Sequence, residues 1–412
     1  MSGADDLDLV GDLAVRDPYA AFGALRDAEP VCWNDRHRAW VLTRHADVSA
    51  ELRGQNLTAE RISPFVRSIE RQAPSEEVVE TFRILENWLV FRDPPEHTRL
   101  RRLVARAFTP SVVKANVDGV AATVDQLAAD LADHLADHET VDLIDAFAAP
   151  LPAIVIAQML GVPPDDRRLF KEWSDQITAL VFGAYGQADR FATGARGMIE
   201  LRDYLVDLIE YYEANPGDNL MSVLLEHEGD DALSRDELVA TCTLLLFGGH
   251  ETTTNLIGNG TLALLTNPDQ RALITREPDR IGPTIEEMLR FDGPARATMR
   301  LVAERHTIDE AVLEPGDRVF LINAAANRDP DVYDEPDRFD IERNPTNHLG
   351  FGIGIHYCLG APLARLEGQL AIRALIDRCP KAALAVDPAE LTWHPTMLSR
   401  GLTELPVALR PG

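Results

Sequence analysis

The chain has 412 residues, 45% hydrophobic and 26% charged, which is ordinary for a globular protein with a sizeable buried core. Its 67 acidic and 40 basic side chains give a net charge of −27 that repels phosphate backbones, so we expect no nucleic-acid partner. The cysteines form no CxxC pair or zinc-like cluster, which favours a reduced, cytoplasmic setting; they are Cys32, Cys242, Cys358 and Cys379.

The N-terminus has neither the basic nor the apolar segment of a secretory signal, so we expect no membrane anchor. Two later apolar stretches, residues 146–164 and 238–268, are interrupted by prolines or carry Glu251, and we interpret both as buried segments. No linker or repeat divides the chain, and we therefore expect one mainly helical domain over residues 1–412.

Three elements are predicted in the first third of the chain. Asp17-Pro18 is a good helix start, with a capping side chain followed by proline in the first turn. Residues 39–43 read as a short strand. Apolar residues recur at helical spacing across 124–135 among aspartates, which predicts an amphipathic helix with a solvated acidic face.

A long helix is predicted over residues 235–267. Ser234 and Glu237 form a capping-box pattern at its start, and the apolar run continues to Asn267-Pro268. At 1.5 Å per residue the helix would be about 45 Å long. Because it is apolar nearly all round, we expect it to cross the protein interior.

Three regions read as β-rich: the N-terminal part, residues 300–325 and residues 385–412. Within the second, β-prone segments flank the turn signal Glu-Pro-Gly-Asp at 314–317, which predicts hairpins.

Cys358 lies in the sequence F-G-x-G-x-H-x-C-x-G over residues 351–360, directly before a helix-like segment. Glycines let the backbone approach a flat cofactor, and a helix N-terminus favours a thiolate. A lone cysteine is most often a small buried hydrophobe. The glycines, Phe351 and His356 reverse that balance here.

This pattern resembles the haem-binding signature of the cytochromes P-450. The resemblance implies the fold of that family, a single mainly α domain around a buried haem b. It implies that Cys358 is the axial thiolate ligand of the haem iron. Neighbouring residues that would contact the cofactor are Phe351, Gly352, His356 and Gly360.

Further motifs extend the resemblance over most of the chain. Glu287-Met288-Leu289-Arg290 is similar to the family's E-x-x-R motif, and its two charges share one helix face. The resemblance implies that Glu287 and Arg290 form a buried charge network with Arg343 that supports the cysteine loop.

Gly248-Gly249-His250-Glu251-Thr252, midway along the long helix, is similar to the family's A-G-x-[DE]-T. Adjacent glycines cost about 1 kcal/mol each in a helix interior, so a close approach or distortion should explain them. The resemblance implies a kink at Gly248 that makes room for dioxygen, with Thr252 bonding to the oxygen and Glu251 relaying protons. Close helix packing is the simpler alternative.

Four cationic residues match positions that bind the two haem carboxylates in the family. His97 and Arg101, four residues apart, would share one helix face. Arg300 and His356 would complete the set, because buried carboxylates need cationic or hydrogen-bonding partners.

The resemblance implies a monooxygenase that inserts one atom of O2 into a hydrophobic molecule. The chain shows no flavin or nicotinamide site, so electrons should come from a separate ferredoxin and ferredoxin reductase. We expect a monomer that docks the ferredoxin through a local basic patch; candidates are Arg99, Arg102, Arg106 and Lys114.

The resemblance also indicates where the substrate would bind, in a mainly apolar pocket. Arg296 is a candidate anchor for a substrate anion. The lining candidates are Trp88, Leu89, Val90, Leu244, Leu245, Gly248, Ala295, Thr298, Met299, Met397 and Leu398.

Three alternatives remain open. A peroxide-driven peroxygenase is disfavoured, because its known fatty-acid-using members replace the acid-threonine pair. A haem-binding sensor without turnover would not need a proton relay. A haem-free helical scaffold predicts a colourless protein.

Overall fold

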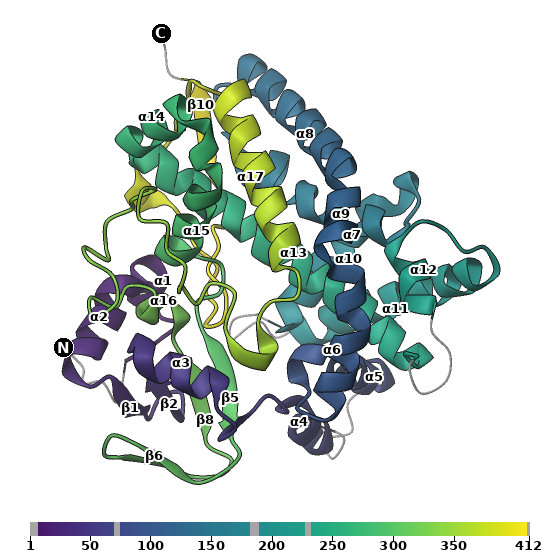
Figure 1. Ribbon diagram of the computed structural model, residues 1–412, viewed down its shortest axis with the longest axis vertical. Helices are drawn as coiled ribbons and strands as arrows, with labels where there is room; N and C mark the ends of the chain where they lie inside the picture. Colours follow the sequence, from purple (N-terminus) through teal and green to yellow (C-terminus); the bar gives the residue numbers. More distant parts are fainter. Residues whose placement is uncertain (1–6, 70–74, 182–188, 227–231, 410–412) are drawn as a thin grey trace.

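The computed structural model describes residues 7–69, 75–181, 189–226 and 232–409, and the mainly helical expectation is confirmed. The long helices gather to the right and top of Figure 1, and the largest sheet lies at its lower left. The α-helices are α1 (Asp12–Arg16), α2 (Pro18–Ala28), α3 (His45–Arg53), α4 (Ile62–Ile69), α5 (Glu76–Glu86), α6 (Glu96–Ala105), α7 (Pro110–Ala115), α8 (Val117–Asp137), α9 (Pro150–Leu160), α10 (Arg167–Val181), α11 (Arg190–Ala214), α12 (Leu220–Leu225), α13 (Arg235–Thr266), α14 (Pro268–Arg276), α15 (Ile281–Asp292), α16 (Asn323–Ala326) and α17 (Ala361–Arg378).

The strands form three small sheets. The five-stranded sheet has the order β1-β2-β8-β5-β3, in which β2 and β8 are parallel and the other pairs antiparallel. A three-stranded sheet has the order β4-β10-β9, and β6 pairs with β7. The strands are β1 (Val31–Asn34), β2 (Ala39–Leu42), β3 (Leu57–Thr58), β4 (Val141–Asp142), β5 (Thr298–Val302), β6 (His306–Ile308), β7 (Ala311–Leu313), β8 (Arg318–Leu321), β9 (Ala382–Leu384) and β10 (Pro406–Leu409).

Two expectations for the β regions need correction. The expected hairpin is confirmed for β6 and β7, which pair antiparallel. The turn at 314–317, however, joins β7 to β8, and these strands belong to different sheets, because β8 pairs with β5 and β2 instead. Residues 385–405, expected to be β-rich, are mostly irregular and hold a 3-10 turn, η10 (Pro388–Glu390), and isolated bridges.

The predicted helix starts are confirmed in detail. The Asp17 carboxylate accepts the amide proton of Ala20 at the start of α2. At the start of α13, Ser234 and Glu237 form both bonds of the capping box, which satisfies amides that would otherwise lack partners. The predicted strand at 39–43 is β2, and the amphipathic helix at 124–135 lies within α8.

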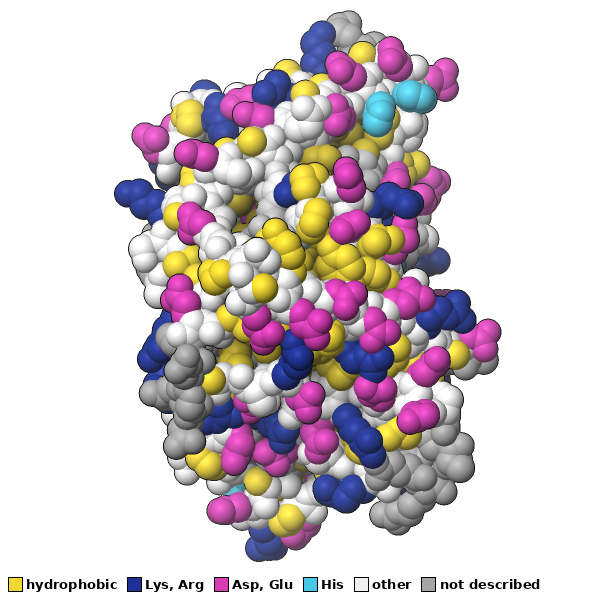
Figure 2. Space-filling model, turned by 90° about the vertical axis from the view of Figure 1, so that its right-hand side faces the viewer, with side chains coloured by type: hydrophobic (Ala, Val, Ile, Leu, Met, Phe, Trp, Pro, Cys, Tyr) yellow, Lys and Arg dark blue, Asp and Glu magenta, His cyan; other side chains and the backbone are white. Residues whose placement is uncertain are grey.

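Helix α13 crosses the core, as its apolar sequence predicts, and packs against α9, α10, α15 and α17. The other apolar stretch, residues 146–164, contains the whole of α9, which is also buried. None of the helices in the described ranges combines the length and apolarity needed to cross a membrane. On the face shown in Figure 2, acidic and basic side chains are interspersed, with hydrophobic side chains between them.

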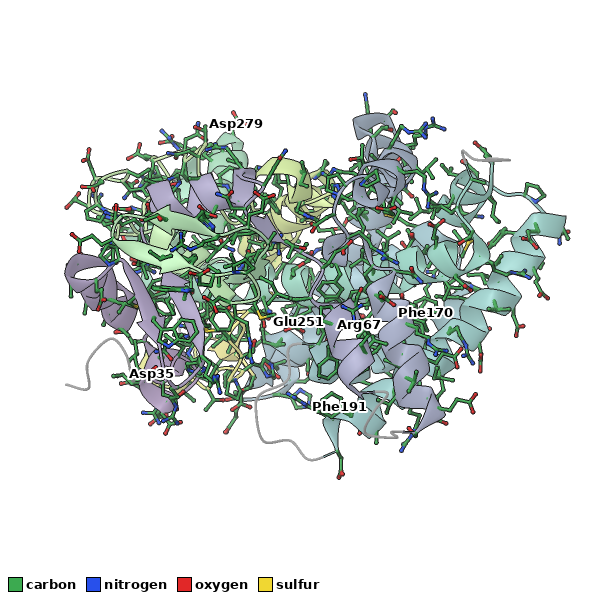
Figure 3. The ribbon with its side chains drawn as sticks, turned by 90° about the horizontal axis from the view of Figure 1, so that it is seen from below. Asp35, Arg67, Phe170, Phe191, Glu251 and Asp279 are labelled. Carbon is green, nitrogen blue, oxygen red and sulfur yellow. The ribbon has the colours of Figure 1, made fainter. Side chains whose placement is uncertain are left out.

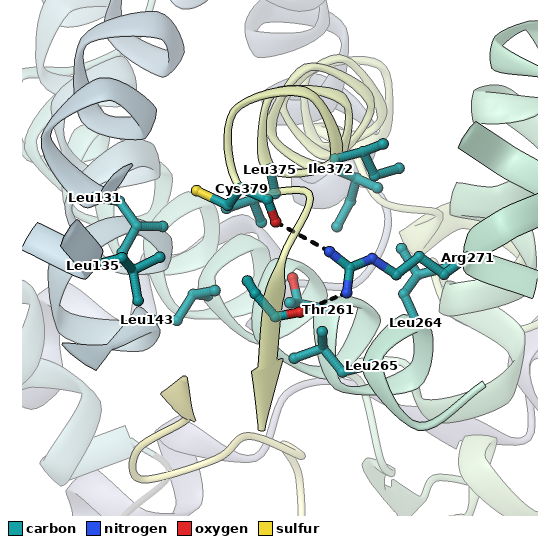
Figure 4. A pocket seen from close by; sticks show the side chains of 12 residues that line it. Leu131, Leu135, Leu143, Thr261, Leu264, Leu265, Arg271, Ile372, Leu375 and Cys379 are labelled. Atoms are coloured by element: carbon teal, nitrogen blue, oxygen red, sulfur yellow. Dashed lines mark hydrogen bonds between the residues drawn. The ribbon is translucent and has the colours of Figure 1, made fainter. Parts of the chain in front are cut away.

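Arg271 of α14 ties the C-terminal end of α17 to the core (Figure 4). Its guanidinium donates to the carbonyl oxygens of Cys379 and Pro380, at 3.1 and 3.0 Å, and to that of Ala382 at 2.6 Å. These carbonyls follow the last turn of α17, where helical partners are missing. A small apolar cavity of about 30 Å³ lies beside this contact, between α8, α13 and α17.

Candidate active site

A cavity of about 320 Å³ lies between α13, the start of α17 and the segment containing Cys358. We call it the reaction cavity, and residues 351–360 the cysteine loop. Its floor includes Cys358, and its opposite wall includes Gly248 and Thr252 of α13. Both motifs are therefore brought to one cavity, although about a hundred residues separate them in the sequence.

The backbone of the cysteine loop is held in a shape that few residues adopt. The Cys358 amide donates to the Phe351 carbonyl at 2.9 Å, which closes the loop, and α17 begins three residues later. Gly352 and Gly354 have φ of 65° and 77°, in the left-handed region that favours glycine. A Cβ at Gly354 would lie 2.6 Å from the carbonyl oxygen of Leu52, so α3 packs directly on this loop.

The environment of Cys358 has opposing effects on its thiol. Burial raises its pKa, while the amides of Gly360 and Ala361 and the positive charges of Arg101 and Arg365 oppose that rise. Burial is the largest effect, so the thiol is not a thiolate at neutral pH without a further cation. A metal ion would supply that cation, because a coordinated thiol loses its proton.

Glu367 is a buried carboxylic acid in the lining of the reaction cavity, and the sequence motifs did not single it out. Burial raises its pKa to about 8. It is therefore mostly neutral at pH 7 and adds little negative charge near Cys358.

An ion-pair cluster that the sequence analysis missed holds the start of α17 next to the cysteine loop. We call this cluster the clamp. Arg365 of α17 binds both carboxylate oxygens of Glu286, at 2.6 and 2.8 Å, and His348 approaches one of them at 2.9 Å. The Arg365 guanidinium also lies over the Phe351 ring, 4.6 Å from its centroid. No motif marks these residues; their only signal is a charge immediately after the loop and another beside Glu287.

The structure brings Glu287, Arg290 and Arg343 together in the core behind this clamp. Glu287 and Arg290 form two bonds of 2.7 and 2.8 Å, and neither side chain is exposed to solvent. Arg343 lies 3.4 Å from the same carboxylate. Arg290 also donates to three carbonyl oxygens, those of Asn327, Pro336 and Arg338, so the pair fixes the segment that leads into the cysteine loop.

The two histidines and two arginines expected to bind the haem carboxylates also converge. The rings of His97 and His356 lie 4.3 Å apart, and Arg101 donates to the Tyr357 carbonyl at 2.6 Å. Burial, with the positive charges of Arg300, His97 and Arg101, lowers the His356 pKa to about 3. Nε2 of each histidine is buried and has no hydrogen-bond partner in the described parts of the chain.

These residues fit a haem. Buried ring nitrogens without a hydrogen-bond partner, beside Arg101 and Arg300, are what two buried carboxylates need, although His356 Nε2 also lies 4.0 Å from an Asp93 carboxylate oxygen. An added Cβ at Gly248, Gly352 or Gly360 would meet nothing within 4 Å, so these glycines leave open space where a flat ring could lie. Cys358 contributes the single soft ligand of the floor.

On α13, Thr252 and Glu251 face different spaces. The Thr252 hydroxyl donates to the Gly248 carbonyl at 2.6 Å and lines the reaction cavity. Glu251 accepts from Asn255 at 3.0 Å and lines a second cavity of about 410 Å³, which we call the acidic cavity; its lining includes Asp142, Asp145, Lys171, Asp175 and His250. Figure 3 places Glu251 near the middle of the molecule.

The predicted kink is not visible as a break, because α13 is continuous from Arg235 to Thr266. The glycines differ in their surroundings. Gly248 opens onto the cavity, whereas a Cβ at Gly249 would contact Ile156 of α9 at 3.9 Å. A contact of 3.9 Å is ordinary van der Waals packing, so close helix packing does not require glycine at either position.

The substrate candidates divide into three groups. Trp88 is fully buried in the core, where its indole donates to the Thr243 hydroxyl at 2.9 Å. Met299, Met397 and Leu398 line a third cavity. Those that line the reaction cavity are Leu89, Val90, Leu244, Leu245, Gly248, Ala295 and Thr298.

The suggestion that Arg296 anchors a substrate anion is wrong. Its side chain is 1% exposed, and its guanidinium donates to the carbonyl oxygens of Leu9, Ala14 and Thr396, at 2.8 to 2.9 Å. It also lies over the Phe22 ring. Arg296 therefore fastens the N-terminal segment to the core through these carbonyl oxygens.

The basic candidates for ferredoxin docking also differ. Arg99 is paired with Glu237 and donates to the Ala232 carbonyl, which links α6 to the start of α13. Three side chains are exposed: Arg102 in α6, Arg106 in the 3-10 turn that follows α6, and Lys114 in α7.

Comparisons with known proteins agree with this geometry. The family model "Cytochrome P-450" matches residues 67–388. Cytochrome P-450 107B1 of Saccharopolyspora erythraea is 41% identical over 377 residues, covering 91% of this chain and 89% of that protein. Cytochrome P-450 monooxygenase PikC of Streptomyces venezuelae is 39% identical, covering 99% and 94%. The crystal structure of CalO2 covers 99% of this chain and 100% of its own, with 32% identity and a TM-score of 0.90, which confirms the fold.

Proposed function

Because the chain belongs to the cytochrome P-450 family, and is thus a monooxygenase with a haem-iron cofactor, we propose that it hydroxylates or epoxidises a hydrophobic small organic molecule. One oxygen atom of O2 enters the product. The proposed cofactor is haem b, with Cys358 as its axial ligand. His97, Arg101, Arg300 and His356 bind its two carboxylates.

The protein binds and orients this cofactor, places charged groups beside it and excludes water from the cavity. When bound, a thiolate-ligated haem supplies the activation of dioxygen, which electron donation from the sulfur favours. Phe351 and the glycines Gly352 and Gly360 shape the floor. The apolar lining supplied by Leu89, Leu244 and Leu245 excludes water from the wall that would meet the substrate.

The two-sided arrangement of Glu251 and Thr252 is the observation that carries the proposal. Thr252 offers a hydroxyl inside the reaction cavity, and Glu251, the adjacent residue, faces the acidic cavity. Adjacent positions of α13 thus place an acid at the acidic cavity and a hydroxyl at the reaction cavity, which are the two groups that a proton relay between these cavities needs. A haem protein that only senses or stores a ligand has no use for this pair.

We also propose how the enzyme obtains its electrons and where it works. A separate ferredoxin and its reductase deliver them, docking at the exposed cations Arg102, Arg106 and Lys114. The chain acts as a monomer in the cytoplasm, and residues 1–412 form one haem domain.

Thr252→Ala tests the relay. We expect the variant to keep consuming O2 while product formed per electron pair falls by about tenfold or more, because general acid–base groups contribute about 10²–10⁴-fold. Thr252→Ser, which keeps the hydroxyl, is the matched control. Undiminished coupling in Thr252→Ala would contradict the relay, and equal turnover with peroxide alone would favour a peroxygenase.

A spectrum tests the cofactor separately. The purified protein, reduced and exposed to carbon monoxide, should give the Soret band typical of a thiolate-ligated haem. The Cys358→Ala variant should lose that band. A colourless protein after expression with added haem precursor would overturn the assignment.

A further inference from the structure

A third cavity, of about 300 Å³, lies beside the reaction cavity and is lined by aromatic and aliphatic side chains with two arginines, Arg61 and Arg190. We call it the aromatic cavity. Its wall shares two short segments with the reaction cavity: Phe91 follows Leu89 and Val90, and Met299 follows Thr298. Its aromatic residues are Phe65, Phe82, Phe91, Phe191 and Phe320.

Arg61 is the unusual member of this lining. It lies immediately before α4, and its guanidinium lies over the Phe91 ring, 4.8 Å from the centroid. It donates one hydrogen bond, to the Met299 carbonyl at 3.1 Å. Within the described ranges no carboxylate pairs with it. Burial and the charge of Arg300 lower its pKa to about 9, so it remains a cation at neutral pH.

A structural arginine of this protein looks different. Arg296 makes three hydrogen bonds to carbonyl oxygens, although its buried Nε has no partner within the described ranges. A guanidinium has five N–H donors, and only one hydrogen bond from Arg61 to the described parts of the protein is present, to the Met299 carbonyl oxygen. Its side chain is half-buried, and it lines the aromatic cavity. The unused donors are therefore available to a molecule inside that cavity.

The proposed cofactor does not require this charge. When bound as proposed, its two carboxylates would have a permanent cation each in Arg101 and Arg300, with the adjacent rings of His97 and His356 beside them. Arg101 lines the reaction cavity, whereas Arg61 lines the aromatic cavity. A cation in an apolar, aromatic space is matched by an anion on an otherwise apolar ligand.

We propose that the aromatic cavity binds the carboxylate end of an amphipathic carboxylic acid, with Arg61 as its anchor. The apolar body of the acid lies against the phenylalanines, and the part to be oxidised extends toward the reaction cavity. This inference names a substrate class for the proposed monooxygenase and rests on that function. Arg61 positions the substrate and takes no part in the oxygen chemistry.

The test compares an acid with its neutral amide in the holoenzyme. Isothermal titration calorimetry at pH 7.5 measures binding of dodecanoate and of dodecanamide to the wild type, Arg61→Gln, Arg61→Lys and Arg190→Gln. We expect the wild type to prefer the acid and Arg61→Gln to bind it about 10- to 100-fold more weakly, as expected for hydrogen bonds to a charged group. Its affinity for the amide should change little.

The other variants locate the effect. Arg61→Lys should keep part of the preference for the acid, because lysine retains the positive charge but lacks the planar N–H donors that can bind both carboxylate oxygens. Arg190 also lines this cavity, with its guanidinium over Phe191, and is the matched control. Arg190→Gln should keep the preference for the acid.

Several results would overturn the proposal: equal affinities for acid and amide in the wild type, a preference that survives in Arg61→Gln, or one lost in Arg190→Gln instead. Haem loss from Arg61→Gln equal to that from Arg300→Gln would assign Arg61 to the cofactor. Arg61-dependent binding without any oxygenated product would support this site and count against the proposed function. Oxygenated product from neutral ligands, with none from the acids, would support the proposed function and count against this site.

Discussion

At the scale of single residues, the ion pair between Glu287 and Arg290 makes a direct prediction, because neither side chain is exposed. Breaking a buried pair leaves one charge without compensation, which costs about 3–5 kcal/mol. Arg290→Ala should lower the free energy of unfolding by that amount in urea titrations of the holoenzyme. Arg338 and Glu335 form a pair with the same spacing on the surface, 55% and 72% exposed. Arg338→Ala should leave the midpoint unchanged, and equal losses in both variants would contradict this account.

Glu286 gives a pH dependence at the same scale. Burial raises its pKa, but hydrogen bonds and charges from Arg365 and His348 outweigh burial and lower it from 4.5 to about 2. A depressed carboxyl pKa stabilises the fold above the unfolded value, and this contribution is lost as the pH falls from about 4.5 toward 2. Glu286→Gln removes the charge, so wild type and variant should differ at neutral pH and converge in acid.

The measurement is urea unfolding at a series of pH values from 7 to 3. The expected difference at neutral pH is about 1–3 kcal/mol, the range for hydrogen bonds to charged groups. Glu277→Gln is the control, because Glu277 pairs with Arg280 on the surface. A difference that stays constant down to pH 3 would show that Glu286 does not titrate as described.

At the scale of elements, what the sequence could predict depends on how local the determinant is. The limits of α13 follow from Ser234, Glu237 and Asn267-Pro268, which act within one turn of the chain. The cysteine loop and the start of α17 follow from a ten-residue motif. The pairing of β8 with β2 depends on residues nearly 280 positions apart, and no local signal encodes it.

The role of Arg296 shows the same limit for a site. Its residue type allows an anion anchor, but the carbonyls that occupy it come from Leu9, Ala14 and Thr396. The clamp of Glu286, His348 and Arg365 also joins three separate segments. The motif residues were identifiable because they match a local pattern of a known family, whereas their supporting residues come from separate segments that only the fold brings together.

Two glycines of α13 allow a matched test of an element. Gly-to-Ala substitution in a helix interior stabilises by about 1 kcal/mol when space allows. A Cβ at Gly248 meets nothing within 4 Å, but one at Gly260 would lie 2.5 Å from the Met288 sulfur of α15. Overpacking costs about 1–3 kcal/mol. Gly248→Ala should therefore be more stable to urea than Gly260→Ala by about that amount, and equal stabilities would contradict the packing of α13 on α15.

At the scale of the whole molecule, the net charge of −27 acts against compactness. Like charges on a folded surface repel one another, and folding brings them closer together. Most ion pairs among the described residues are on the surface, where each contributes little. Stability must therefore come mainly from the apolar core around α13. The repulsion between surface charges opposes it, and salt can weaken that repulsion.

Raising sodium chloride from about 10 to about 150 mM shortens the Debye length from about 30 to about 8 Å, so repulsion between distant carboxylates is screened. We expect the thermal unfolding midpoint of the holoenzyme at pH 7.5 to rise over this range. Near pH 4.7, the isoelectric point of the sequence, the same salt increase should have little effect, because the net charge is close to zero there. A midpoint at pH 7.5 that falls with salt would mean that attractive ion pairs outweigh the repulsion. Screening would then weaken the contacts that hold the fold, and the surplus of 67 acidic over 40 basic side chains would not be what limits its stability.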